Sequence, residues 1–196
     1  MDEHGCGIAS CLSLLQGRYS SGLIASTFSY GRLTIPWGVS PLTDHLLSSQ
    51  AFDIVHDGAS VLRSDKVRWL AEWPEALQLL RVCLVGAEKD RNCCRCEKCI
   101  RTILSFRAWG IPKPECFEFD ASNRQIIGLK YFHEPLFYGY AAIIKAARQN
   151  GQTGSWIRAV QISMGINRLR QVVKSLLARV NQGAAKHNKH SPPLRE

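Results

Sequence analysis

The sequence predicts an α/β fold in which strands of a partial open parallel sheet come first and a helical C-terminal region follows. Two short apolar runs with β-branched residues, 22–27 and 52–58, have the composition of buried strands. Apolar residues recur at helical spacing after the second run, over 64–72, 74–81 and 97–109. In open sheets of this kind, ligands bind at the carboxyl ends of the strands.

Further helices are predicted from the same periodicity. A first helix covers 5–16, and the C-terminal region contains one helix within 131–149 and another over 155–180. Ser64 and Pro74 are expected at the starts of the two helices that follow the second strand, because both residue types are common at helix starts.

Five of the eight cysteines lie between residues 83 and 99. Two overlapping C-x-x-C steps follow a lone upstream cysteine, and such steps wrap the backbone around a metal so that the sulfurs point inward. Tetrahedral zinc takes four ligands of this kind. We therefore predict a structural zinc site made of Cys83, Cys93, Cys96 and Cys99. Cys94 is the reserve ligand, because adjacent cysteines rarely aim at one point without backbone strain.

Two alternatives to zinc remain open. Ferredoxins also contain C-x-x-C-x-x-C, although their fourth cysteine and a proline follow downstream, whereas here Cys83 lies upstream and a helix follows Cys99. A reactive or disulfide-bonded cluster is less favoured, since unpaired thiols are an oxidation liability. Four cysteine ligands leave no open coordination position, so we expect the metal to hold a loop against the following helix and not to catalyse.

The cysteine segment resembles the zinc-binding C-terminal motif of the 7-cyano-7-deazaguanine synthases, which are PP-loop ATP pyrophosphatases. The resemblance rests on Arg81-Val-Cys83, Asn92-Cys-Cys-Arg-Cys-Glu-Lys-Cys99, Arg101-Thr102 and Gly110. Family members have C-G-x-C-x-x-C, and here Cys94 replaces the glycine, which would perturb the turn or offer a competing sulfur. The resemblance implies an ATP-dependent carbon–nitrogen ligase that adenylates a carboxylate and amidates it with ammonia, and then forms a nitrile.

The same resemblance implies residues of a substrate pocket at the strand ends and in the long loop over 30–45. These are Ser26, Tyr30, Asp44 and Asp57, with Asp44 the strongest candidate for a polar contact to the acceptor. A surface loop with one packed tryptophan is the structural alternative for this loop.

A phosphate site is implied at the start of the helix over 64–72. The stretch Arg63-Ser-Asp-Lys-Val-Arg68 is similar to the (S/T)-K-x-E-(I/V) segment of PP-loop enzymes, and Arg63 and Lys66 would bind phosphate or pyrophosphate there. An exposed first turn with a pair between Asp65 and Arg68 is an equal alternative.

The ATP-binding loop of the family, S-G-G-x-D-S, does not occur in these 196 residues. The chain is therefore expected to be inactive by itself, as a truncated or split gene product or one with a mis-assigned start. ATP becomes a cofactor only if another segment or chain supplies the loop. We expect the exposed sheet edge to be covered by such a partner or by a second copy of the chain.

Positive charge is concentrated at the C-terminal end. The formal net charge is +9, and from Lys145 onward ten basic residues face only Glu196. This asymmetry fits an alternative function, a non-catalytic zinc-binding module whose C-terminal third contacts RNA or an acidic partner. A solvated basic helix and tail explains the charge at least as well. An apolar stripe on the helix over 155–180 indicates core or oligomer packing, and its members are Leu169, Val172, Val173, Leu176, Leu177 and Val180.

Three parts are expected along the chain. Residues 1–115 would form the C-terminal half of a PP-loop domain with the zinc site at 83–99, residues 116–183 a helical extension, and residues 184–196 a disordered basic tail. The sequence has no basic region before its first apolar run and no segment long enough to span a membrane. We expect a cytoplasmic, reducing location, which suits thiolate ligands.

Overall fold

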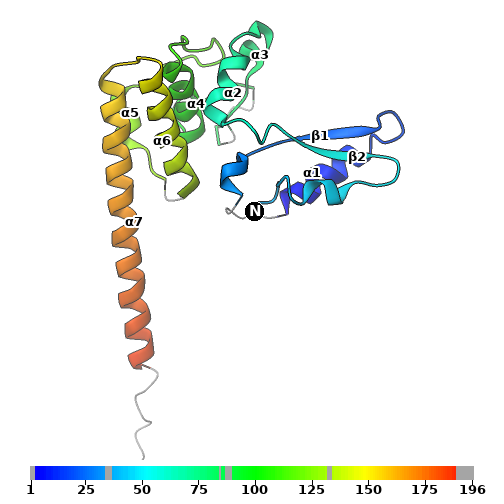
Figure 1. Ribbon diagram of the computed structural model, residues 1–196. Helices are drawn as coiled ribbons and strands as arrows, with labels where there is room; N and C mark the ends of the chain where they lie inside the picture. Colours follow the sequence, from blue (N-terminus) through cyan, green and yellow to red (C-terminus); the bar gives the residue numbers. More distant parts are fainter. Residues whose placement is uncertain (1–2, 34–36, 84, 87–89, 132–133, 189–196) are drawn as a thin grey trace, which may run out of the picture. The chain divides into compact units, whose positions relative to one another are not determined.

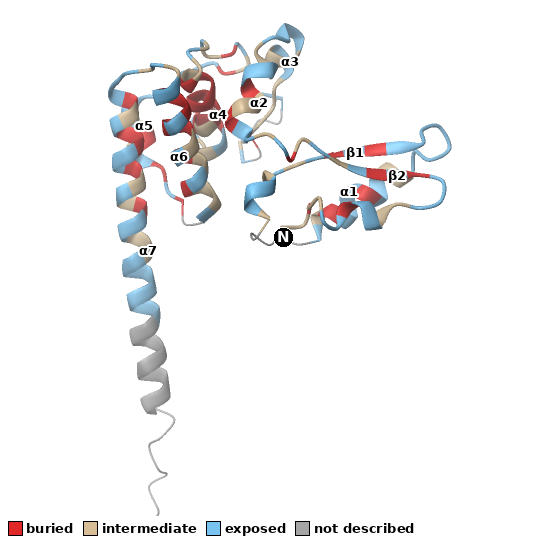
Figure 2. Ribbon diagram, viewed as in Figure 1, coloured by how far each residue is buried: buried red, intermediate tan, exposed pale blue. Residues whose placement is uncertain are grey.

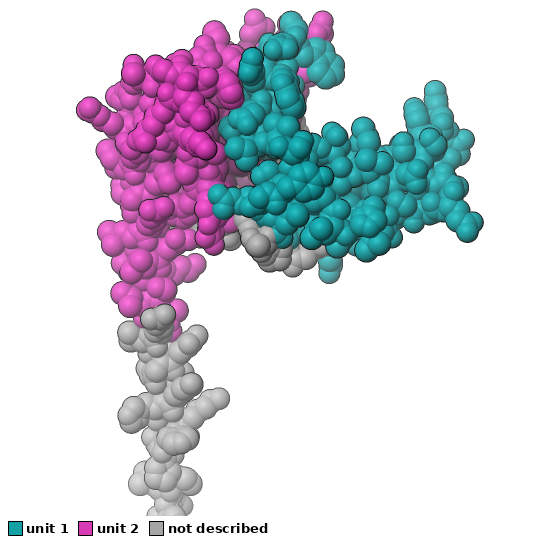
Figure 3. Space-filling view, in the orientation of Figure 1, with its two compact units in different colours: residues 1–74 teal, residues 75–196 magenta. Residues whose placement is uncertain are grey.

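The computed structural model divides into two compact units, an N-terminal unit of residues 1–74 and a C-terminal unit of residues 75–196 (Figures 1 and 3). The structure describes residues 3–33, 37–83, 85–86, 90–131 and 134–188, with side chains up to residue 178. The sequence analysis assigned the cysteine motif to the first part of the chain, whereas the division at Pro74 places it with the C-terminal helices.

The N-terminal unit is a small α/β layer. Its elements are α1 His4–Ser13, β1 Ser21–Ala25, the 3-10 turns η1 Tyr30–Arg32 and η2 Asp44–Leu47, β2 Asp53–Asp57 and α2 Arg63–Leu70. The two strands pair in parallel, with Ser21 opposite Asp53 and Ala25 opposite Asp57. Both strands were predicted, and their parallel pairing confirms the α/β class.

The two faces of this sheet differ in burial (Figure 2). One face packs Ile24, Phe52 and Ile54 against a small core that includes Ala9 of α1. On the other face Leu23 is 66% exposed and Val55 is 42% exposed. Parallel sheets are normally covered on both faces, and a two-stranded sheet buries little apolar surface.

The C-terminal unit is helical. Its elements are α3 Pro74–Leu79, which begins at the division, α4 Glu97–Ala108, α5 Asn123–Gly128, α6 Glu134–Gln149 and α7 Ser155–Asn188. The apolar face predicted for α4 lies in the core, where Ile100, Ile103, Leu104 and Ala108 are at most 1% exposed. Phe106 is also fully buried, so α4 is enclosed on more than the predicted face.

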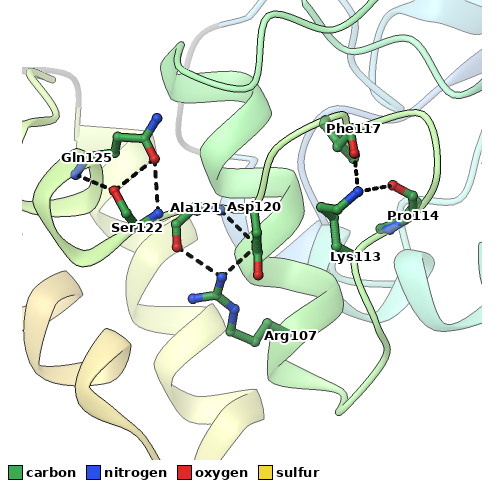
Figure 4. A network of polar contacts seen from close by, with 8 residues as sticks. All are labelled: Arg107, Lys113, Pro114, Phe117, Asp120, Ala121, Ser122 and Gln125. Atoms are coloured by element: carbon green, nitrogen blue, oxygen red, sulfur yellow. Dashed lines mark hydrogen bonds and ion pairs between the residues drawn. The ribbon is translucent and has the colours of Figure 1, made fainter.

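The connection from α4 to α5 is anchored at two points (Figure 4). Lys113 Nζ donates to the carbonyl oxygens of Pro114 and Phe117. Arg107 Nη2 donates to Asp120 Oδ1 at 2.6 Å and to Ala121 O at 3.0 Å. These bonds fix an irregular segment whose backbone would otherwise be free to move.

Several predicted helix boundaries differ from the structure. Leu62 is the N-cap of α2, and Ser64 is buried inside the helix and does not cap it. Helix α5 was not predicted, although Ser122 and Gln125 form a capping box at its start. Helix α7 runs to Asn188, into the segment expected to be disordered, and 189–196 lie outside the described residues.

Among the helices that the structure describes, none is both long and apolar enough to cross a membrane.

Candidate metal centre and strand-end cluster

The four cysteines predicted as metal ligands come together in the C-terminal unit. One sulfur each from Cys83, Cys93, Cys96 and Cys99 lies within 4.8 Å of all the others. The Cys93–Cys99 and Cys83–Cys96 pairs have sulfur–sulfur distances of 3.9 Å. A tetrahedral zinc with bonds of about 2.3 Å requires sulfurs about 3.8 Å apart. The donor set and its spacing therefore fit a structural zinc ion.

Backbone N–H groups point at the sulfurs of this cluster. Gly86 N donates to Cys83 Sγ at 3.2 Å, and Cys96 N donates to Cys93 Sγ at 3.4 Å. Cys99 N donates to Cys96 Sγ at 3.5 Å, which makes Cys96 the N-cap of α4 as well as a candidate ligand. Donors of this kind stabilise thiolates, and the N-terminus of α4 adds its positive dipole end.

The thiols of the cluster differ in how readily they ionise. Burial opposes ionisation of Cys83, but hydrogen bonds from the backbone and side chain of Cys93 and from the backbone of Gly86 outweigh it and lower the pKa to about 6. Burial, followed by the hydrogen bond with Cys96, raises the pKa of Cys99. Four thiolates this close repel one another, so a bound cation is needed for all of them to ionise together.

Asn92 organises the loop that carries the first ligand. Its side chain is buried, and its Oδ1 accepts from Val82 N at 3.0 Å and Cys83 N at 3.2 Å. Its Nδ2 donates to Leu80 O at 2.7 Å and Cys116 O at 3.1 Å. One amide group thus joins three backbone segments around Cys83.

Cys94 lies outside the four-sulfur group, as predicted. Its backbone has φ +55°, in the left-handed region that favours glycine, and it is the only described non-glycine residue with positive φ. Its side chain is buried and its Sγ donates to Asn92 O at 3.4 Å. The turn between the first two C-x-x-C cysteines therefore requires the conformation for which the related motif has glycine.

We predict that Cys94→Gly keeps one metal ion per chain. Relief of the left-handed backbone offsets the lost burial of the thiol, so the free energy of unfolding should stay within about 1 kcal/mol of the wild type. Cys94→Ala loses the thiol without relieving the backbone and should be about 1 kcal/mol less stable than the glycine variant. Elemental mass spectrometry and urea unfolding test both points, and metal loss in either variant would make Cys94 a ligand.

A second cluster forms at the strand ends of the N-terminal unit. Lys66 Nζ of α2 donates to Ser26 Oγ, just beyond β1, at 2.7 Å. Gly58 has φ +76°, and a Cβ there would lie 2.9 Å from Lys66 Nζ, so the glycine leaves room for the ammonium group. Burial lowers the pKa of Lys66, the nearby Asp57 raises it, and Arg63 lowers it further. The implied phosphate residues Arg63 and Lys66 thus lie with Ser26 and Asp57.

Two other predicted substrate residues are placed differently. The side chain of Asp44 is 1% exposed, and its Oδ2 lies 2.6 Å from His56 Nδ1 while its Oδ1 accepts from Ser40 N at 2.9 Å. Both carboxylate oxygens are therefore used inside the unit. Tyr30 is 57% exposed, and its backbone N–H donates to Ala59 O. Residues 34–36 of the intervening loop lie outside the described residues.

Neither Asn92 nor His56 was predicted as a site residue. The sequence shows an asparagine directly before the paired cysteines, but it does not show the four backbone groups that this side chain contacts. His56 Nε2 is buried without a hydrogen-bond partner among the described residues, while Nδ1 faces Asp44. A single histidine within a predicted strand gave no signal for this pairing.

Comparisons with protein-family models, with curated proteins and with solved structures gave no match to this chain.

Proposed function

We propose that this chain is the zinc-bearing part of an ATP-dependent ligase of the PP-loop type, similar to the 7-cyano-7-deazaguanine synthases. The observation that carries the proposal is the four-cysteine cluster, whose C-x-x-C-x-x-C steps lead directly into α4. The zinc would hold the loop to this helix and supply no open position for chemistry. The resemblance requires a structural metal and an α/β unit in the same chain.

The open sheet of the N-terminal unit supports the same proposal. Its Leu23 and Val55 face is exposed, and two parallel strands by themselves are a marginal core. Further strands and a helix layer, supplied by another segment or chain with the S-G-G-x-D-S loop, would cover this surface. ATP would then bind at the completed sheet, with its phosphates near Lys66 and Arg63.

In this arrangement Lys66 and Arg63 neutralise the phosphates and Ser26 orients the ammonium group of Lys66. Burial lowers the pKa of Lys66 because it disfavours the charged ammonium group. A bound phosphate would stabilise that charged form, so phosphate binding and protonation of Lys66 would favour each other. Asp44, bonded to His56 and Ser40, would shape the pocket from inside the unit and would reach an acceptor only after rearrangement.

We predict that the zinc-loaded chain binds pyrophosphate weakly and forms no AMP from ATP. Lys66→Ala removes a charged contact and should weaken pyrophosphate binding about tenfold or more. Lys98→Ala, an exposed lysine on α4, is the matched control and should bind as the wild type does. Isothermal titration calorimetry measures pyrophosphate binding, and chromatography measures AMP formation. Equal binding by Lys66→Ala would remove the phosphate site, and AMP formation would show that the chain already contains an ATP site.

The second candidate function is a non-catalytic zinc module that contacts RNA or an acidic partner through its C-terminal third. This function would depend on the surface of α7. Two of its basic side chains already serve packing: Arg168 lies over the Phe137 ring at 5.8 Å, and Arg170 donates to Leu129 O at 3.4 Å. The larger exposed feature of α7 is apolar. This favours protein association over nucleic-acid contact on this helix.

The apolar positions of α7 have the spacing of a coiled coil. Along the helix, five of them are separated by four and three residues in turn. After the first of the five, isoleucine or valine alternates with leucine. The positions are Ile162, Ile166, Leu169, Val173 and Leu176. Leu169, Val173 and Leu176 are 65%, 47% and 53% exposed, and Val172 and Leu177 widen the stripe. We propose that this stripe pairs with α7 of a second copy, since β-branched residues alternating with leucine favour parallel dimers.

We predict that the double variant Leu169→Glu, Leu176→Glu lowers the native mass from dimer to monomer without unfolding the chain. Both residues are exposed, so their replacement leaves the core intact while carboxylates at the seam repel each other. Ser175→Glu adds one carboxylate at an exposed position outside the stripe and should leave the dimer unchanged. Sedimentation over a range of protein concentrations measures the native mass, and a monomeric wild type would contradict the proposed dimer.

A further inference from the structure

Two adjacent cavities lie over the zinc loop of the C-terminal unit, beside the cysteine cluster. The first has a volume of about 390 Å³ and reaches from Arg91 to Phe119. The second has a volume of about 440 Å³ and extends to Arg124 and Lys130. Arg95 and Gln125 line both, so the two cavities form one recess. Each volume is in the range of small-molecule sites.

Among the charged side chains that line this recess, the cations outnumber the acids. The cations are Arg91, Arg95, Arg124 and Lys130, all of them exposed. Two carboxylates also line the recess, but Glu97 is paired with Arg101 at 2.7 Å and accepts from Tyr140. Glu118 is the other acid. An anionic ligand would therefore find an excess of positive charge here.

An exposed aromatic ring stands at one end of the recess. Phe119 is 61% exposed, whereas its neighbour Phe117 on the same connection is fully buried. In the sequence it lies between the two anchors of the α4–α5 connection, which are the Lys113 bond to Phe117 and the Arg107 bonds to Asp120 and Ala121. The backbone beside the ring is thus fixed before any ligand binds, which reduces the entropy lost on binding.

The metal loop fixes the other side of the recess. The left-handed turn at Cys94 buries that side chain, and Arg95 is exposed on the metal loop directly before Cys96, the N-cap of α4. Arg124 projects from α5, whose start is closed by the capping box of Ser122 and Gln125. A cation on the metal loop, a cation on the capped helix α5 and an aromatic ring on an anchored connection form a preorganised surface.

We propose that this recess binds a nucleoside phosphate, with the base stacked on Phe119 and the phosphate held by Arg95 and Arg124. An inorganic anion would use the cations but not the ring, whereas a base with its phosphate uses both. The nucleotide could be free or part of a single strand, whose bases are open to stacking. The recess is lined by residues of the C-terminal unit alone, whereas the Lys66 cluster belongs to the N-terminal unit.

The test is fluorescence anisotropy of a short single-stranded oligouridylate with the zinc-loaded chain at low salt, with UMP and inorganic phosphate as competitors. Phe119→Ala should weaken binding roughly 5- to 150-fold, which is the effect of losing one stacked base. Arg95→Ala and Arg124→Ala should weaken it and reduce the salt dependence by about one phosphate contact each. Competition by UMP at concentrations near those of the strand identifies a free-nucleotide site, and much weaker competition identifies a single-strand site.

Two lysines serve as matched controls for these variants. Lys98→Ala removes a cation from α4 that does not line either cavity, and Lys174→Ala removes one from α7. Both should bind as the wild type does, and every variant should keep its zinc and its melting temperature because the replaced side chains are exposed. The proposal is overturned if the wild type binds no strand at low salt, if Phe119→Ala and Arg95→Ala bind normally, or if only Lys174→Ala is impaired.

Discussion

Replacing Cys99 by serine should cost the protein its metal and unfold the loop and helix start around residues 83–99. Apparent zinc-binding free energies of about 10–16 kcal/mol in small cysteine sites equal or exceed the whole stability of a typical domain, about 5–15 kcal/mol. Burial raises the pKa of the remaining Cys96 thiol, so without a cation this group takes up a proton and no longer helps to hold the loop. The apolar core of α4 and α6 should retain helix, but its melting should become broad and shift to lower temperature.

Elemental mass spectrometry, circular-dichroism melting and chelation of the wild type measure this effect together. About one zinc per chain, no visible colour and loss of cooperative melting on chelation are expected. Cys11→Ser replaces an exposed cysteine of α1 and should change neither metal content nor melting. Iron with sulfide and a brown spectrum would contradict structural zinc and support a cluster, and a metal-free wild type would refute the site itself.

Asn92→Ala should be the most damaging single substitution outside the four cysteines. It leaves the N–H groups of Val82 and Cys83 and the carbonyls of Leu80 and Cys116 without their partner. At roughly 1 kcal/mol for each lost bond, the free energy of unfolding should fall by about 4 kcal/mol. Zinc affinity should fall about 10- to 100-fold, because the amide positions the backbone of a ligand.

Urea unfolding at fixed zinc and competition with a chelating dye separate the two parts of this prediction. Asn123→Ala is the matched control, since Asn123 is exposed and donates one hydrogen bond, to Ser155 Oγ at 2.7 Å. The Asn123→Ala substitution should lower the free energy of unfolding by less than about 1 kcal/mol and leave the zinc affinity unchanged. If the two asparagine variants behaved alike, Asn92 would have no special role in holding the loop.

The elements that could be predicted from the sequence are those set by local pattern. Ligand spacing selected Cys83, Cys93, Cys96 and Cys99, because two C-x-x-C steps restrict where the sulfurs can point. Short apolar runs with β-branched residues located β1 and β2, and helical periodicity located α4. Each signal is contained within one short segment, so no knowledge of the tertiary structure was needed.

The rest depends on contacts between distant residues. Asn92 reaches Leu80 and Cys116, which lie twelve and twenty-four positions away, and no local pattern encodes that meeting. Asp44 was expected to face a substrate, yet it lies buried against His56 because the loop folds back onto the sheet. Helix α5 spans only six residues, too few for apolar periodicity to be seen.

The uncovered face of the two-stranded sheet also bears on the lifetime of the protein in a cell. Leu23 and Val55 would be presented to chaperones and proteases as long as nothing covers them. Under the proposed function, newly made chains that fail to meet the missing strands would be removed, and chains that meet them would persist. The abundance of this protein would then follow the supply of its partner, so that assembly sets the amount of active enzyme without any separate control.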